Sequence, residues 1–288
     1  DSQTLYIEIT DDDQANMDAL GLQYGLDPAH PLSGLLDQAE LQQLKNAATQ
    51  ADVPGGMPTL DMMRPWLAAL TLSAAPLLKA GLDPQHGVDK QLKAQMLAAG
   101  KPVLGLETAE QQIRLLADMP DAMQLAFLRS TLRDIDKGAA ELTELIDAWK
   151  TGDTASIARI EDEDLRQQDP GLYQRLLVQR NQNWAAKIGD LLRHQHGTIF
   201  IAVGAAHLAG PDSVQAQLQK LGIEAVRHGS SHARFRRSPL AGDAVDLIHV
   251  SHQSKSIARK RAPTRRGRFL APSTGYPRRA RHFPRCNP

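Results

Sequence analysis

Two side chains able to do acid–base or metal chemistry lie where predicted strands end. Glu107 follows the apolar run 102–106, whose composition and length predict a buried strand. His207 follows the apolar, β-branched run 198–203 after a turn of Gly and Ala. The carboxyl ends of parallel strands line the ligand crevice of a doubly wound sheet. We therefore expect the carboxylate of Glu107 and the imidazole of His207 to point toward one place.

Glu8 is a third candidate, because it is a carboxylate inside the otherwise apolar strand 5–9. An unpaired buried carboxylate is costly, so we expect Glu8 to contact a cation, a hydrogen-bond network or a metal ion. Two glutamates and one histidine suit a divalent ion such as Zn or Mn, although their spacing matches no diagnostic ligand motif. The slim turn at Gly204 would let backbone approach a ligand closely.

A purely structural role fits each of these residues too. Glu8 could lie on an exposed edge face of the sheet, and Glu107 could do no more than favour the dipole of the helix that begins after it. His207 could hydrogen-bond only its own loop. Residue types and spacing leave both interpretations open.

The elements that must position these side chains are short apolar strands separated by longer helices. Apolar or β-branched runs predict strands at 5–9, 102–107, 198–203 and 223–226. Helical spacing and capping patterns predict helices at 39–51, 66–80, 89–99, directly after Glu107, 121–152 with a break near Gly138, 156–165, 172–194 and 211–221. The segment 198–226 then forms a βαβ unit, whose parallel strands imply a sheet covered by helices. The predicted fold class is α/β, with a central, mostly parallel sheet and many flanking helices.

The composition favours a helix-rich fold. Aromatic residues make up 4% and apolar residues 42% of the chain, so the core must consist mainly of Leu, Ala, Ile and Val. No run approaches the roughly 20 apolar residues that span a membrane as a helix. The single cysteine, Cys286, excludes an internal disulfide and a cysteine metal cluster.

The formal net charge of zero hides two oppositely charged segments. Of the 33 Lys and Arg residues, 14 lie from Gly229 onward, against two of the 33 acidic residues. Residues 229–288 therefore carry +12, and residues 1–228 carry −12. An acidic domain is not attracted to a phosphate backbone, which excludes nucleic acid as a partner of the folded domain.

The chain is predicted to divide into a folded domain, residues 1–228, and a tail, residues 229–288. The tail mixes Ser, Arg, Pro and His without helical or alternating periodicity, which predicts a disordered basic segment. A second interpretation is that this segment is an out-of-frame translation of a GC-rich gene, which also yields sequence rich in Arg and Pro that has no hydrophobic core. A purposeful nucleic-acid or membrane-surface tail is the third interpretation.

The segments around Glu107 and His207 resemble motifs of the TraB/GumN family. Lys-Pro-Val-Leu-Gly-Leu-Glu-Thr at 101–108 resembles the family's Leu-Glu-Thr segment, and Gly-Ala-Ala-His at 204–207 resembles its second Gly-x-x-His motif. Arg180-Asn181, Gly-Val-Asp at 87–89 and Pro-Trp at 65–66 fall in the expected order. The similarity covers roughly residues 4–228. This family includes the Tiki proteases and is related to the erythromycin-esterase/ChaN-like proteins.

The resemblance implies a metal-dependent hydrolase of peptidase type that acts on a peptide or small-molecule substrate. It implies a divalent metal ion (Mn, Co or Zn) that activates water for attack on a carbonyl, while a carboxylate takes the proton. Carried over residue by residue, the metal or catalytic positions are Glu8, Glu107 and His207, with support from Arg180, Asn181 and Gly204. Arg180 would steady the developing oxyanion, but a solvated helix charge or a salt bridge fits it equally well.

The chain also departs from the family pattern. In the family pattern, the first Gly-x-x-His motif should precede the strand that contains Glu8. The sequence begins at Asp1, almost directly at that predicted strand, and does not include the motif. We therefore expect an amino-terminally truncated domain with an incomplete active site. The remaining histidines of 1–228 are predicted to be surface side chains: His30, His86, His194, His196 and His228.

Location and an alternative function follow from the family alone. Relatives are often exported or membrane-tethered, which implies an exported or membrane-associated protein. A non-enzymatic binding or accessory protein, linked to pheromone inhibition or exopolysaccharide production, is the alternative from another functional class. The oligomeric state is left open by the sequence.

Overall fold

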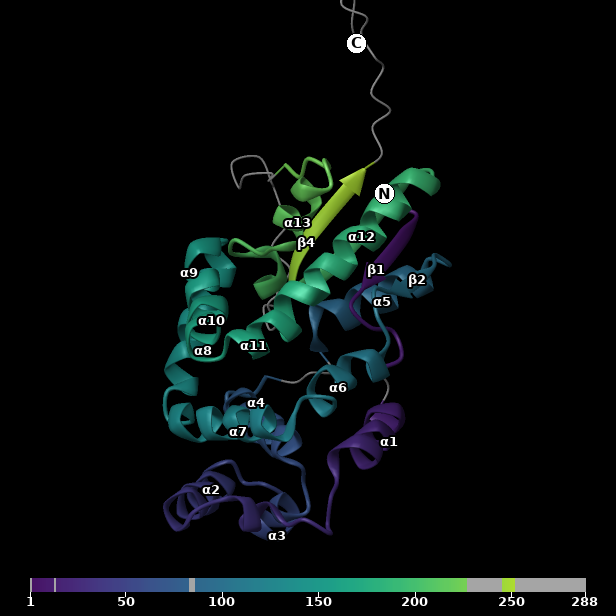
Figure 1. Ribbon diagram of the computed structural model, residues 1–288. Helices are drawn as coiled ribbons and strands as arrows, with labels where there is room; N and C mark the ends of the chain where they lie inside the picture. The colour runs from purple at the N-terminus through teal and green to yellow at the C-terminus, as the bar shows by residue number, and fades with distance from the viewer. Residues whose placement is uncertain (1, 13, 83–85, 227–244, 252–288) are drawn as a thin grey trace, which may run out of the picture. The chain divides into compact units, whose positions relative to one another are not determined.

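The computed structural model describes residues 2–12, 14–82, 86–226 and 245–251 (Figure 1). Helices predominate, and the strands form one sheet in the order β2-β1-β3-β4. The strands are β1 (Thr4–Ile7), β2 (Val103–Gly105), β3 (Thr198–Gly204) and β4 (Val245–Ser251). The first three are mutually parallel, which confirms the α/β fold class predicted from the sequence.

The register of the sheet brings three distant parts of the chain to one edge. Ile7 of β1 lies opposite Gly105 of β2 on one side and Ala202 of β3 on the other. Because these strands are parallel, the segments that follow them leave the sheet at the same end. Glu8, Glu107 and His207 are in those segments.

Helices pack on both faces of the sheet, because alternate strand residues point to opposite sides. On one face, Tyr6, Ile201 and their alternate neighbours pack against α12 (Gln179–His194) and α13 (Val214–Lys220). On the other face, Leu5 and Ile7 pack against α5 (Val88–Ala98). The core of the sheet therefore lies between helices on both faces, as expected for the predicted α/β fold class.

A helical subregion lies between β1 and β2 in the sequence. Its core joins α2 and α4 to α7, through side chains such as Leu44, Leu72 and Leu128, all fully buried. The capping box of Asp37 and Glu40 starts α2, and Pro65 occupies the first turn of α4. Its elements are α1 (Gln14–Gly25), η1 (Leu32–Leu35), α2 (Gln38–Gln50), α3 (Gly56–Asp61) and α4 (Pro65–Lys79).

The helices between β2 and β3 follow the predicted pattern closely. The predicted capping box of Thr108 and Gln111 starts α6, and the predicted break near Gly138 separates α7 from α8. Two π-helical segments, Arg159–Glu163 and Gln174–Val178, interrupt the later helices. The elements are α6 (Ala109–Ala117), α7 (Asp121–Asp134), α8 (Gly138–Thr151), α9 (Thr154–Ala158), α10 (Asp164–Gln168) and α11 (Pro170–Tyr173).

Four local predictions were wrong. Strand β1 ends at Ile7, so Glu8 lies directly after the strand and not inside it. The strand that ends before Glu107 is not buried, since it lies at the sheet edge and leaves Leu104 43% exposed. The residues 223–226 form no strand, so 198–226 is not a βαβ unit, and the free side of β3 pairs with antiparallel β4. Ser213, whose hydroxyl accepts from the backbone of α13, starts that helix three residues later than predicted.

β4 lies inside the segment 229–288, which the sequence predicted to be a disordered tail. The structure describes only 245–251 of that segment, and there the chain pairs with β3 along seven residues. The prediction for the remainder of the tail, including its possible origin in another reading frame, falls outside the described residues and stays a prediction.

Candidate functional site

Each parallel strand delivers one side chain to the common edge of the sheet. Glu8 directly follows β1, Glu107 lies two residues beyond β2, and His207 lies in the short helix η5 (Ala205–Leu208) after β3. The backbone N–H of Glu107 donates to the carbonyl of Glu8 at 2.9 Å, which holds the first two segments together. Gly105 permits this turn, because a Cβ there would lie 2.6 Å from the carbonyl oxygen of Glu107.

Arg180 on α12 bridges both glutamates. Its Nη2 donates to Oε2 of Glu8 at 2.7 Å and to Oε1 of Glu107 at 2.6 Å, and its Nε lies 3.0 Å from the same Glu107 oxygen. The Arg180 residue is only 9% exposed. Arg180 therefore forms salt bridges and is not a solvated helix charge, whereas its role toward an oxyanion stays a prediction.

His207 is linked to the same guanidinium through a defined tautomer. Nη1 of Arg180 lies 3.0 Å from Nε2 of His207, and Nδ1 of His207 lies 2.6 Å from Oδ1 of Asn181. A guanidinium can only donate, so Nε2 must accept and the ring proton must be on Nδ1. Asn181 in turn donates from Nδ2 to the backbone oxygen of Asp212 at 2.8 Å, which fixes the orientation of its amide.

The environment moves the pKa values of the two carboxyl groups in opposite directions. Burial alone would raise the pKa of Glu8, but His207 in its protonated form, the charge of Arg180 and the backbone N–H of Gly204 outweigh it and lower that pKa. For Glu107, burial outweighs the hydrogen bonds and charge of Arg180, so its pKa is raised. Glu107 is therefore the stronger base of the pair.

The pKa values of the two basic groups, His207 and Arg180, are also shifted in opposite directions. Burial is the largest cause that lowers the pKa of His207, to about 4, so its ring is neutral at neutral pH. Burial also works against the charge on Arg180, but the two glutamates outweigh it and raise the pKa of that residue. One permanent cation thus faces two carboxyl groups and a neutral imidazole.

The backbone of Gly204 binds the carboxylate of Glu8. Its backbone N–H donates to Oε1 of Glu8 at 2.8 Å, and a Cβ at this position would lie 3.3 Å from the same oxygen. The close approach predicted for a ligand at this turn is made in the structure by a side chain of the protein itself.

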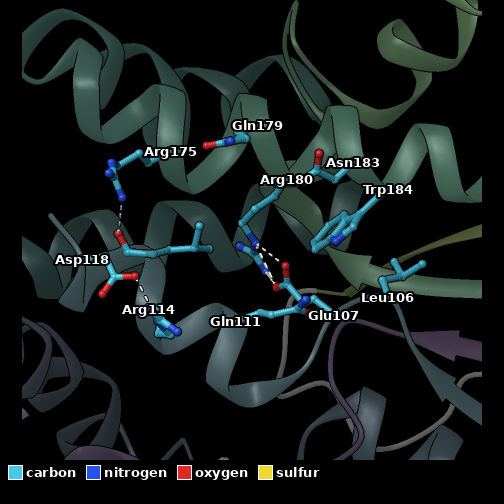
Figure 2. Close-up of a pocket in the computed structure, with 11 residues that line it drawn as sticks. Leu106, Glu107, Gln111, Arg114, Asp118, Arg175, Gln179, Arg180, Asn183 and Trp184 are labelled. Atoms are coloured by element: carbon cyan, nitrogen blue, oxygen red, sulfur yellow. Dashed lines mark hydrogen bonds and ion pairs between the residues drawn. The ribbon is translucent and has the colours of Figure 1, made fainter. Parts of the chain in front are cut away.

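A pocket of about 720 Å³ opens beside this cluster, between α6 and the helical segment that leads into α12 (Figure 2). Glu107 and Arg180 line it, together with Trp184. The Trp184 ring lies 4.4 Å from the His207 ring between centroids, and Cζ of Arg180 lies 4.7 Å from the Trp184 ring centroid. The pocket therefore gives a ligand access to one carboxylate and to the bridging guanidinium.

Residues 1–227 match the sequence profile of the TraB/PrgY/gumN family. The chain belongs to this family. The chain is also similar to two curated proteins, the uncharacterized protein YbaP of Escherichia coli (strain K12) and YbaP of Shigella flexneri. Each is 31% identical to this chain over 182 residues. The aligned region covers 62% of this chain and spans 65% of the length of these relatives. No solved structure matches the chain.

The TraB/PrgY/gumN resemblance implies a metal ion held by Glu8, Glu107 and His207, and the geometry can test it. Their oxygen and nitrogen donors suit Mn, Co or Zn. As it stands, the arrangement leaves no place for an ion between them, because the guanidinium of Arg180 contacts all three side chains and an ion would have to displace it. Within the described ranges, no group of three or more His, Cys, Asp and Glu residues is placed to hold a metal ion.

Four of the five histidines that were predicted to be surface side chains lie in the described part of the TraB/PrgY/gumN domain. All four are exposed, as predicted: His30, His86, His194 and His196. His228 lies outside the described residues. In the described domain, no helix is long and apolar enough to span a membrane.

Sequence reasoning missed three residues that support the centre. Trp184 packs on His207, and Lys187 donates to the backbone oxygens of Gly105 and Leu106 at 2.8 and 3.1 Å. Gln112 lies 3.4 Å from Glu8 and 3.3 Å from Glu107 through Nε2. Trp184 and Lys187 follow Arg180 by four and seven residues, so helical spacing was the signal that could have identified them.

Proposed function

We propose that this protein is a hydrolase of peptidase type whose catalytic groups are Glu107 and Arg180. One observation carries the proposal. Glu107 and Arg180 both belong to the ion-pair cluster, which consists of Arg180 with Glu8, Glu107 and His207, and both line the 720 Å³ pocket. Glu8 contacts Nη2 of Arg180, which it shares with Glu107, and His207 contacts Nη1; both act as positioning residues. The proposed roles are consistent with membership of the TraB/PrgY/gumN family, which the sequence match shows independently of them.

The proposed reaction uses groups of this chain. A water molecule beside Glu107 attacks the carbonyl carbon of a bound peptide or small-molecule substrate, and Glu107 takes a proton from that water. Its raised pKa makes it a better base. The charge of Arg180 stabilises the oxyanion, and the proton on Glu107 passes to the leaving amine or alcohol as the bond to it breaks.

A divalent metal ion at this centre is a further proposal, and it is supported by the family resemblance alone. Binding of Mn, Co or Zn by Glu8, Glu107 and His207 requires the guanidinium of Arg180 to leave these side chains. No step of the proposed reaction is therefore assigned to a metal.

The test is hydrolysis of unstructured fluorogenic peptides and of simple esters, each measured with EDTA and with added Mn, Co or Zn. Glu107→Gln is expected to lower kcat/KM by about 10² to 10⁴, the usual contribution of a general base. Glu110→Gln is the matched control, because Glu110 lies three residues away with an exposed side chain.

Equal losses in the two variants, or full activity in Glu107→Gln, would contradict the proposed role of Glu107. Absence of turnover under every metal condition would contradict the hydrolase proposal as a whole. A binding or accessory protein would then be the remaining functional class.

A further inference from the structure

The pocket beside Glu107 has a second charged region that the proposed reaction does not use. Figure 2 shows Arg114, Asp118 and Arg175 together at one side of the pocket, with Trp184 at the other side and Glu107 between them. Arg114 comes from α6 and Asp118 directly follows that helix, whereas Arg175 comes from the facing π-helical segment. The region therefore lies within the same pocket but away from the ion-pair cluster.

Arg175 is the unpaired cation of this region. Nε of Arg114 donates to Oδ2 of Asp118 at 3.0 Å, so these two charges neutralise one another. Nη1 of Arg175 donates to the backbone oxygen of Leu115 at 3.2 Å, and no carboxylate of the described residues lies within ion-pair distance of it. A guanidinium has five N–H donors, so most of those on Arg175 are available to a ligand.

The wall that continues from Arg175 suits a polar, chain-like ligand. Gln179 and Asn183 follow at four-residue intervals, which places all three side chains on one helical face that lines the pocket. Both amides are exposed, and neither has a hydrogen-bond partner in the part of the chain that the structure describes. Each side-chain amide offers donors and an acceptor, the complement of a peptide backbone.

We propose that Arg175 is a specificity residue that binds an anionic group of the ligand, a carboxylate or a phosphate, while the reacting carbonyl lies at Glu107. The fork of a guanidinium matches both groups in a bidentate manner. The position of the reacting carbonyl rests on the proposed function. The anion preference rests on Arg175 alone and can be measured without turnover.

The experiment is isothermal titration calorimetry of the full chain with matched peptide pairs. The pairs are acetyl-tetraalanine as free acid or amide, acetyl-Ala-Ala-Glu-Ala-amide or its Gln counterpart, and the corresponding phosphoserine or serine peptide. The anionic member of at least one pair is expected to bind about tenfold more tightly, and the pair concerned identifies the source of the anion.

Arg175→Gln is expected to abolish this preference, whereas Arg175→Lys, which keeps the charge without the fork, should retain part of it. Arg193→Gln is the matched control, because Arg193 is an exposed arginine of α12 that does not line the pocket. Circular dichroism of each variant verifies folding. Equal affinities within every pair, no binding of any anionic peptide, or a preference that survives in Arg175→Gln would each overturn the proposal.

The two proposals fail separately in this design. The preference is measured again in Glu107→Gln, which lacks the proposed base but keeps Arg175. A preference that persists there supports the anion site whether or not the unaltered chain hydrolyses any of the test substrates.

Discussion

The guanidinium of Arg180 is the only group of the described residues that contacts Glu8, Glu107 and His207 together. Two carboxylates in a buried place repel one another, and each has lost much of its hydration. One planar cation offsets both effects, and its remaining N–H fixes the tautomer of the imidazole. At the scale of single residues, the centre is therefore organised around a cation that the protein supplies itself.

Replacing Arg180 should destabilise the fold far more than replacing a surface arginine. Arg180→Ala leaves two partly buried carboxylates without a cation, and the loss of one partner of such a pair costs up to about 3–5 kcal/mol in the free energy of unfolding. The measurement is urea denaturation at pH 7. Arg159→Ala, which breaks the exposed pair with Glu144, is the control and should cost no more than about 1 kcal/mol. Similar losses in both variants would show that the buried network contributes little.

At the scale of elements, the two π-helical segments place side chains where a regular helix would not. One carries Arg175 to the pocket, and the other carries Asp162 into the interior. Asp162 is 3% exposed, and neither of its carboxyl oxygens has a hydrogen-bond partner in the described part of the chain. Oδ2 lies close to Gly210, where a Cβ would be 2.6 Å from it. Such π segments frequently occur at functional sites.

Burial, with added repulsion from Glu161 and Asp212 and a smaller opposing effect of Arg166, raises the pKa of Asp162 to about 7. Because the folded-state pKa exceeds the ordinary value of 3.8, the folded state holds the proton more tightly. The stability that this proton contributes is complete below about pH 4 and is lost as the pH rises through about 7.

Asp162→Asn should therefore stabilise the protein at alkaline pH and have little effect near pH 4. The expected gain at pH 8 is roughly 2–4 kcal/mol, since one pKa unit corresponds to about 1.4 kcal/mol. Urea denaturation of both proteins from pH 4 to pH 8 provides the measurement, with exposed Glu163→Gln as the control. A difference in stability that does not change with pH would refute the titration of Asp162.

At the scale of the whole molecule, the sheet extends beyond the segment that was predicted to fold. β4 covers the edge of β3 along seven residue pairs, from Thr198 opposite Ser251 to Gly204 opposite Val245. Strand β3 leads directly to His207, so pairing along its length supports the segment that carries the imidazole. An uncovered strand edge would instead expose unpaired backbone groups.

Shortening the chain tests this arrangement. A chain that ends at His228 lacks β4 and should show a lower Tm and more aggregation than a chain that ends at His252. Differential scanning calorimetry and light scattering measure the two effects. Identical behaviour of the two chains would mean that β4 does not stabilise the domain.

The sequence alone was sufficient for features that local chemistry controls. Capping residues, proline at the first turn and helical spacing predicted α2, α4 and α6, because these signals act within a few residues. The convergence of Glu107 and His207 was also predictable, since parallel strands must end on one side of their sheet. Arg180 and Asn181 were found through the family motif.

Only the tertiary structure decided which partners these residues meet. Glu8 and Arg180 are 172 positions apart, and the sequence carries no local signal of their ion pair, which depends on how α12 packs on the sheet. The order of the strands likewise placed β2 at an exposed edge of the sheet. It also paired β3 with β4, whereas the sequence predicted a strand at 223–226 parallel to β3. Strand order and helix packing are set by long-range burial of apolar surface, and a short window of sequence does not contain that information.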